Sequence, residues 1–117
     1  MKRMPTVYKI CRESEWREAE RSGVFRGSAV DRRDGFIHFS SAAQVAETAA
    51  KHFAGARDLL LIFVDAAKLG DKLKWEVSRG DALFPHLYDV LDLGSVRRVD
   101  ALPLGQDGRH QFPLLDD

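Results

Sequence analysis

Apolar residues recur along the chain with two different spacings, which predict a mixture of helices and strands. Between Ala42 and Phe53 they fall three or four positions apart, which is typical of one face of a helix. Ser40 and Ser41 come directly before this segment as N-cap residues, and Ser41 with Gln44 has the pattern of a capping box. The strongest helix prediction of the chain therefore begins just after Ser41.

A second, more polar helix is predicted from Glu13 to Ser22. Trp16 and Ala19 supply its apolar positions, and Gly23 stands where a left-handed residue would end it. The segment from Gly27 to Gly35 has no periodic apolar pattern and carries four charges, so we predict a surface loop there.

Strands are predicted where β-branched and aromatic residues cluster or alternate with polar ones. The run from Leu59 to Val64 is continuously apolar, which predicts a central strand buried on both faces. In the segment Lys72 to Ser78, alternation predicts a half-buried strand on which Glu76 and Trp75 point to opposite faces. The segments predicted as strands are Thr6 to Cys11, Phe36 to Phe39, Asp58 to Asp65, Lys72 to Ser78 and Val96 to Leu102, and Leu83 to Tyr88 is predicted as an extended segment because of Pro85.

The totals indicate one α+β domain covering residues 1–117, with residues 105–117 as a tail. A chain of 117 residues can bury a single core without disulfides. Eighteen basic and eighteen acidic residues balance, so no nucleic-acid partner is indicated. No segment is apolar enough to span a membrane, no signal peptide is predicted, and Cys11 is the only cysteine, which predicts a cytoplasmic location by default.

The first candidate for chemistry is His38, which lies on a short apolar strand directly before Ser40 and Ser41. Backbone N–H groups at the start of a helix favour an anionic group such as a phosphate or carboxylate. The alternative is that the serines are only caps and that His38 is a hydrogen-bonded core histidine.

A second group of candidates lies in the segments around Trp75 and His86. Glu76 can act as a general base or bind a sugar hydroxyl, and its alternative is an exposed ion pair. His86 and Tyr88 are two positions apart on an extended segment, so their side chains share a face. For this segment the alternative is a proline-fixed loop in which Tyr88 closes a turn. A more specific alternative to both interpretations is a metal site formed by His38, Glu76 and His86, although no local ligand spacing supports it.

At these residues the chain resembles the mostly bacterial proteins grouped as domain of unknown function 952. The resemblance extends over nearly the whole chain, and the segments GFIHFS and FPHLY are its most specific part. Members are sometimes labelled glutathione S-transferase-like, but the chain is too short for a thioredoxin-type domain followed by a helical domain.

The resemblance implies a fold similar to the ADP-ribosyltransferases, with small mixed or antiparallel sheets and two main helices. It implies in particular a likeness to the RNA 2′-phosphotransferases that use NAD, in which a strand ending in His-Leu-Ser precedes a helix, as His38-Phe39-Ser40 does here. The chain departs from that pattern on its first strand, where Tyr8-Lys9-Ile10 stands in place of a histidine-glycine pair. NAD is therefore implied by fold analogy alone.

Our leading hypothesis is a cleft that binds a small phosphorylated or nucleotide-like ligand. Its catalytic candidates are Glu76, His86 and His38, and its ligand-binding candidates are Ser40, Ser41, Tyr88, Gln44 and Trp75. The second hypothesis is a non-catalytic binding or structural domain in which the same side chains hold two loops together. The sequence does not decide between the two, and it does not determine the oligomeric state.

Overall fold

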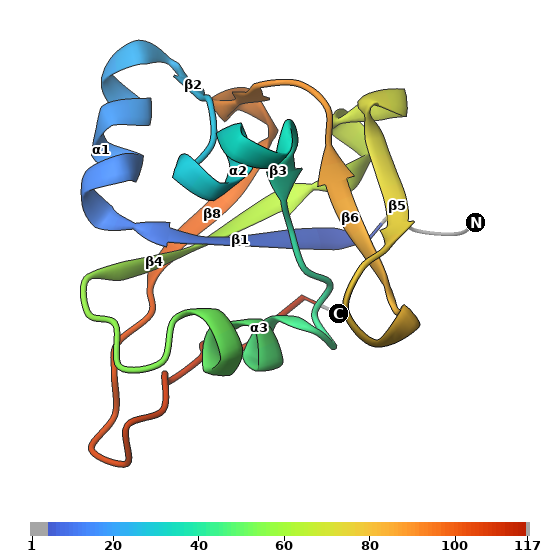
Figure 1. The fold of residues 1–117 in the computed structure, drawn as a ribbon. Helices are drawn as coiled ribbons and strands as arrows, with labels where there is room; N and C mark the ends of the chain where they lie inside the picture. Colours follow the sequence, from blue (N-terminus) through green and yellow to red (C-terminus); the bar gives the residue numbers. More distant parts are fainter. Residues whose placement is uncertain (1–4, 117) are drawn as a thin grey trace.

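The computed structural model describes residues 5–116, and each segment predicted as a strand or as an extended segment contains a strand. Two short strands and a third helix add to them. The strands are β1 (Thr6–Arg12), β2 (Val24–Phe25), β3 (Ile37–His38), β4 (Leu59–Asp65), β5 (Leu73–Val77), β6 (Leu83–Leu87), β7 (Leu91–Asp92) and β8 (Val96–Ala101), and the helices are α1 (Glu13–Ser22), α2 (Ala29–Asp34) and α3 (Val45–His52) (Figure 1).

The strands of residues 5–116 form three antiparallel sheets. The central sheet has the order β1-β4-β8, the histidine sheet has the order β3-β6-β5, and β2 pairs with β7. The chain between β3 and α3 joins the first two sheets, because the backbones of Tyr8 and Ser40 exchange hydrogen bonds of 2.8 and 2.9 Å. The α+β class and the single compact domain are thus confirmed.

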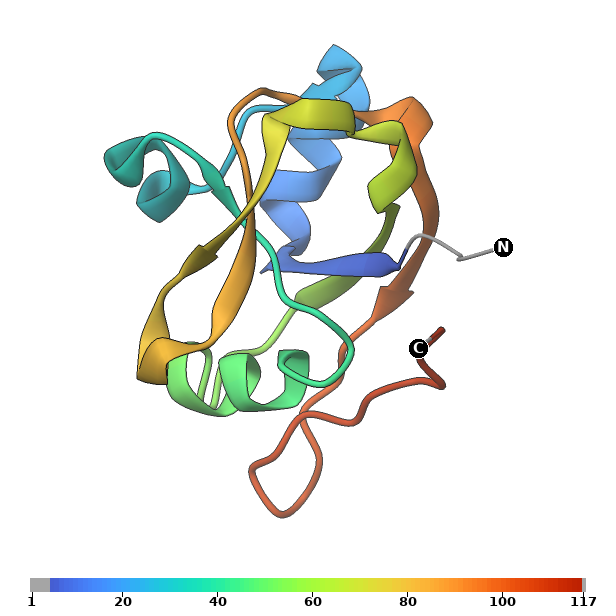
Figure 2. The same cartoon turned by 90° about the vertical axis from the view of Figure 1, so that its right-hand side faces the viewer.

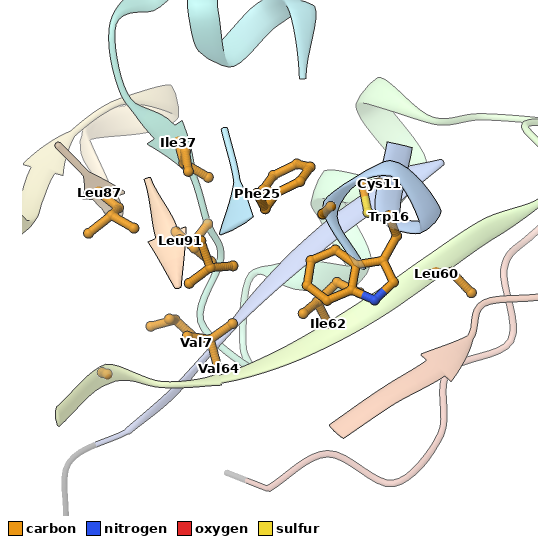
Figure 3. Close-up of a cluster of buried hydrophobic side chains, with 13 residues drawn as sticks. Val7, Cys11, Trp16, Phe25, Ile37, Leu60, Ile62, Val64, Leu87 and Leu91 are labelled. Atoms are coloured by element: carbon orange, nitrogen blue, oxygen red, sulfur yellow. The ribbon is translucent and has the colours of Figure 1, made fainter. Parts of the chain in front are cut away.

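The central sheet has an apolar cluster on each of its two faces. Val7, Ile62 and Val64 point to the face that is covered by α1, β2 and the inner side of the histidine sheet (Figure 3). Tyr8 and Phe63 point to the other face, which α3 and the C-terminal segment cover (Figures 1 and 2). Because β4 is sandwiched in this way, its residues are apolar without alternation, and the prediction of a central strand is confirmed.

The predicted surface loop from Gly27 to Gly35 is wrong, because α2 occupies most of it. Capping interactions at its two ends stabilise this helix, which has no apolar stripe. The backbone N–H of Ser28 donates to Asp31 Oδ2 at 2.9 Å, and the N–H of Asp31 returns to Ser28 Oγ at 3.4 Å. Gly35 then ends the helix in the left-handed region, with φ of 87°.

The helix predicted to begin after Ser41 begins later, at Val45, and positions 42–44 form a turn. The backbone N–H of Ser41 donates to Gln44 Oε1 at 3.0 Å, which is one half of the expected capping box. Ser40 does not cap the helix, because its hydroxyl pairs with that of Thr48 at 2.9 Å.

The half-buried pattern expected for β5 is also wrong, although the strand itself is present. Trp75 and Val77, two of the apolar residues of that alternation, are exposed. The reason is the position of β5 at the edge of its sheet, where the hairpin with β6 extends beyond the core (Figure 1).

The C-terminal residues 103–116 return along the central sheet. Phe112 and Leu115 pack against the cluster around Tyr8, and the backbone N–H of Asp116 donates to the Tyr8 hydroxyl at 2.9 Å. Within residues 5–116, no helix is long and apolar enough to cross a membrane.

Candidate functional site

A cleft of about 640 Å³ lies where the central sheet meets the histidine sheet, and this volume is in the range of small-molecule sites. A second hollow, of about 470 Å³, lies on the loop 106–111 and contains none of the predicted residues. Side chains that line the main cleft include Tyr8 and Lys9 of β1, Asp31 of α2, His38 and Ser40 around the end of β3, and His86 of β6.

The two histidines reach the cleft because of strand register. Ile37 pairs with Leu87, and His38 pairs with His86. Side chains of directly paired residues point to the same face of a sheet, and neighbours along a strand point to opposite faces. Ile37 and Leu87 therefore enter the core, while the two imidazoles share the other side, with ring centroids 5.5 Å apart. We call this side, with His38, Glu76, Phe84 and His86, the histidine face.

His38 is held between two carboxylates of α2. Its Nδ1 lies 2.7 Å from Asp31 Oδ1, and its Nε2 lies 3.0 Å from Asp34 Oδ2. The two carboxylates lie on opposite sides of the ring and fix its orientation.

Asp31 is the buried centre of this group and also pairs with Lys9. Lys9 Nζ donates to Asp31 Oδ2 at 2.8 Å and to Oδ1 at 3.0 Å, and both side chains are buried. Burial acts to raise the pKa of Asp31, but the hydrogen bond from His38 and the charge of Lys9 outweigh it, and the pKa is lowered well below its usual range.

Glu76 forms a second group with His86 and Tyr88. Its Oε1 lies 2.9 Å from His86 Nδ1 and accepts a 2.6 Å hydrogen bond from the Tyr88 hydroxyl. The hydrogen bond from Tyr88 lowers the pKa of Glu76 most, and the hydrogen bond from His86 lowers it further. The hydrogen bond to Glu76 in turn raises the pKa of Tyr88. Since an ionised Glu76 can only accept, His86 donates from Nδ1, and its Nε2 is the ring nitrogen that Glu76 does not engage.

Phe36 joins the two groups and was not among the predicted residues. Its ring stacks on His86 with a centroid distance of 4.1 Å and also contacts the rings of His38 at 4.6 Å and Tyr88 at 5.2 Å. Phe36 could have been predicted from its position two residues before His38, because residues i and i+2 of a strand share a face. For Lys9 the signal was a charged residue within a buried strand, which requires a counter-ion.

The predicted site residues separate into three sets in the structure, and Trp75 belongs to none of them. His38, Ser40 and His86 line the cleft. Glu76 and Tyr88 lie on the same side of the sheet but contact His86 rather than the cleft. Ser41 and Gln44 connect the turn before α3 to the β5–β6 hairpin, where Gln44 Nε2 donates to the Leu83 carbonyl at 2.7 Å, and Trp75 points to the opposite side of its sheet.

The alternative of a metal centre finds no matching geometry. Among residues 5–116, no three His, Cys, Asp or Glu side chains are placed so as to hold a metal ion. Each nitrogen of His38 faces a carboxylate of α2, Asp31 or Asp34, and not a shared point with Glu76 and His86.

The fold and the site together define a small α+β domain with a cleft lined by two imidazoles, each oriented by a carboxylate. The chain belongs to the DUF952 family, described as a protein of unknown function, whose sequence model matches residues 10–99. This confirms the resemblance of the sequence to that family.

Solved structures of a relative from Caulobacter crescentus, protein CC0527, are similar to this chain. Its X-ray crystal structure is 51% identical, with a TM-score of 0.87, and covers 91% of this chain and 93% of that one. Its solution NMR structure, also 51% identical, has a TM-score of 0.82 and covers 91% of both chains. No curated protein sequence matches the chain significantly.

Proposed function

We propose that the chain binds a small phosphorylated or nucleotide-like ligand in the cleft between the central and histidine sheets. The observation that carries this proposal is the convergence of His38, Ser40 and His86, from segments far apart in the sequence, on one concave surface. A structural role alone does not require two imidazoles to border an open cleft.

The charges of the lining favour a ligand that combines anionic and neutral polar parts. Lys9 is neutralised by Asp31, and His38 stands between two carboxylates, so neither adds a strong net attraction for anions. Arg12 and Arg33 border the same cleft and are exposed, and Arg side chains bind phosphate well. Arg33 is also paired with Asp34 at 3.0 Å, so anion binding is expected mainly at Arg12.

The remaining lining suits a ring system with hydroxyl groups. The hydroxyl of Ser40 and Nε2 of His86 provide hydrogen-bonding atoms, and Phe53 and Phe84 provide an apolar wall. A neutral imidazole whose Nδ1–H is fixed by a carboxylate is suited to accept a hydroxyl proton at Nε2. In this proposal His86 is the group that contacts the ligand hydroxyl, and Glu76 positions it.

NAD is the first ligand to test, because the resemblance to ADP-ribosyltransferases implies it. When bound, NAD would supply an ADP-ribosyl group for transfer, with Arg12 and Arg33 near its phosphates and His86 near a ribose. Transfer of an ADP-ribosyl or phosphoryl group is the corresponding reaction class. Since Lys9 stands on β1 where those enzymes have their histidine-glycine pair, ADP-ribose and simple mononucleotides belong in the same test.

The test is an NMR titration of the labelled protein with NAD, ADP-ribose, AMP and adenosine. We expect saturable shifts of His38, Ser40 and His86 for the phosphorylated ligands and weaker ones for adenosine. Arg12→Ala is expected to weaken binding about tenfold, by loss of a charged hydrogen bond. The control is Arg57→Ala, which removes an exposed arginine that does not line the cleft. Absence of shifts at millimolar ligand would contradict the proposal.

One observation favours the second candidate, a non-catalytic structural role. Both nitrogens of His38 and the Nδ1 of His86 already have partners within the protein. In that case His38→Ala destabilises the fold by about 1–3 kcal/mol, the cost of buried groups that lose a partner. The same titration then shows no ligand-dependent shifts, so the two candidates give different results.

A further inference from the structure

Strand β5 is an edge strand whose outer side meets no other strand of residues 5–116. In the histidine sheet it pairs with β6 alone. In Figure 1 it runs along the outside of the molecule, and in Figure 2 it faces the viewer. Unpaired edge strands are sites at which another chain can extend a sheet.

The backbone of β5 presents its odd-numbered residues outward. The N–H of Tyr88 donates to the Lys72 carbonyl at 2.9 Å, and the N–H of Ser78 donates to the Ala82 carbonyl at 3.0 Å. Hydrogen-bonded pairs alternate along an antiparallel ladder, so the polar groups of Trp75 face away from β6. Pro85, which has no N–H, stands opposite Trp75 and agrees with this assignment.

The side chains of β5 are self-complementary about Trp75. In an antiparallel pair centred there, Lys74 lies opposite Glu76 of a second copy, and Leu73 lies opposite Val77 of a second copy. Opposite charges that face each other across strands stabilise a pair, and like charges oppose it. If one strand slides by two residues in one direction, Lys74 lies opposite Lys74 of the second copy. If it slides by two residues in the other direction, Glu76 lies opposite Glu76 of the second copy. Of these three registers, only the one centred on Trp75 keeps the backbone hydrogen bonds and also pairs opposite charges.

From these observations we propose that two copies of this chain associate through β5, in antiparallel pairing centred on Trp75, to form one continuous six-stranded sheet. The two Trp75 side chains then lie side by side on the face opposite the histidines.

The exposed apolar residues of the hairpin provide area for such a contact. Trp75 is 40% exposed, Val77 63% and Leu83 51%, and strand pairing places Leu83 beside Val77. In the paired sheet, Leu73 of the second copy continues the row formed by Leu83 and Val77. Apolar side chains on an edge strand that carries one lysine and one glutamate do not protect it against its own copy.

The pairing also connects the interface to the candidate site. Lys74 of the second copy approaches Glu76, which orients His86 through Nδ1. Each copy would thus supply a cation next to the carboxylate that positions the other copy's imidazole. The inference does not depend on the proposed function, since it rests on β5 alone.

Sedimentation velocity of the full chain over a range of concentrations tests the proposal. We expect a concentration-dependent dimer. Val77→Pro removes an outward N–H without touching the ladder to β6 and is expected to abolish the dimer, whereas Val77→Thr retains it. Lys74→Glu replaces two attractive pairs with two repulsive ones and should weaken association at least about tenfold. A monomer up to about millimolar concentration, or a dimer that Val77→Pro leaves intact, overturns the proposal.

A disulfide trap covers the case in which Val77→Pro fails to fold. Paired residues on the two-fold axis have Cα atoms within disulfide range, so Trp75→Cys should give a covalent dimer under mild oxidation. The native Cys11 is buried and does not compete. Val90→Cys is the matched control, because Val90 is comparably exposed but outside β5. Equal rates of cross-linking for the two variants would refute β5 pairing.

Discussion

Two carboxylate–imidazole pairs stand on either side of Phe36, and they are built in opposite ways. In the first, the Asp31 side chain is 2% exposed and its partner His38 is 32% exposed. In the second, Glu76 is 41% exposed and its partner His86 is 6% exposed. One pair buries the acid, and the other buries the base.

The difference decides what each pair contributes. A buried carboxylate loses its hydration, so it must be compensated by charges and donors, and Lys9, His38 and the Ser28 N–H provide these for Asp31. Glu76 keeps water as a partner, so removing its charge while keeping an acceptor for His86 costs the fold little. We therefore expect the Asp31 group to support stability and the Glu76 group to determine the properties of His86.

The largest expected effect is that of Asp31→Asn. This change leaves the ammonium of Lys9 buried without a counter-charge, which costs about 3–5 kcal/mol of unfolding free energy. Asp34→Asn, at the exposed end of the same histidine, is the control and should alter stability little. Urea denaturation measures both, and equal losses for the two variants would contradict the assigned role of the buried acid.

Acid should act on the first pair in a predictable direction. The pKa of folded Asp31 is lowered, whereas the unfolded chain has the ordinary value of about 3.9. A depressed folded pKa gives stability that is present above the unfolded pKa and lost as pH falls towards the folded one. The urea midpoint of the native chain should fall steeply below about pH 4, and that of Asp31→Asn should fall less. Parallel pH profiles would refute the linkage.

Glu76→Gln is expected to leave most of the stability and to alter its neighbours. Because the hydrogen bond and charge of Glu76 raise the pKa of Tyr88, the substitution should bring the phenol back towards its ordinary value. Ultraviolet titration of tyrosinate measures this change, and Tyr88→Phe identifies the signal, since Tyr8 is buried in the core. An unchanged titration curve would mean that the Glu76–Tyr88 contact is absent in solution.

The same contrast explains which parts could be predicted from sequence. Glu76, His86 and Tyr88 were found together because alternation along two extended segments is a local signal. Asp31 was missed, since its segment lacks apolar periodicity and α2 depends on a capping box. Its ion pair with Lys9 arises only when α2 folds over β1, which no local pattern encodes.

The errors at α3 and β5 have similar physical causes. Ser40 and Ser41 were both predicted as N-cap residues. In the structure the Ser40 hydroxyl instead pairs with that of Thr48, and the helix begins only at Val45. For β5, alternation predicted correctly that Trp75 and Glu76 face opposite ways. It did not show which side is covered, because that depends on where the core ends.

The last prediction concerns Cys11, which lies two residues from Lys9 on β1 and serves as a probe of local opening. Burial raises the pKa of its thiol to about 12, so the folded chain should react with thiol reagents only when β1 opens. If the Asp31 group holds this region closed, Asp31→Asn should accelerate labelling roughly a hundredfold, which corresponds to about 3 kcal/mol. Glu76→Gln, on the other sheet, should leave the rate nearly unchanged. Similar acceleration by both variants would show that the two pairs support one cooperative unit, and the division between a stabilising pair and a site-forming pair would then be wrong.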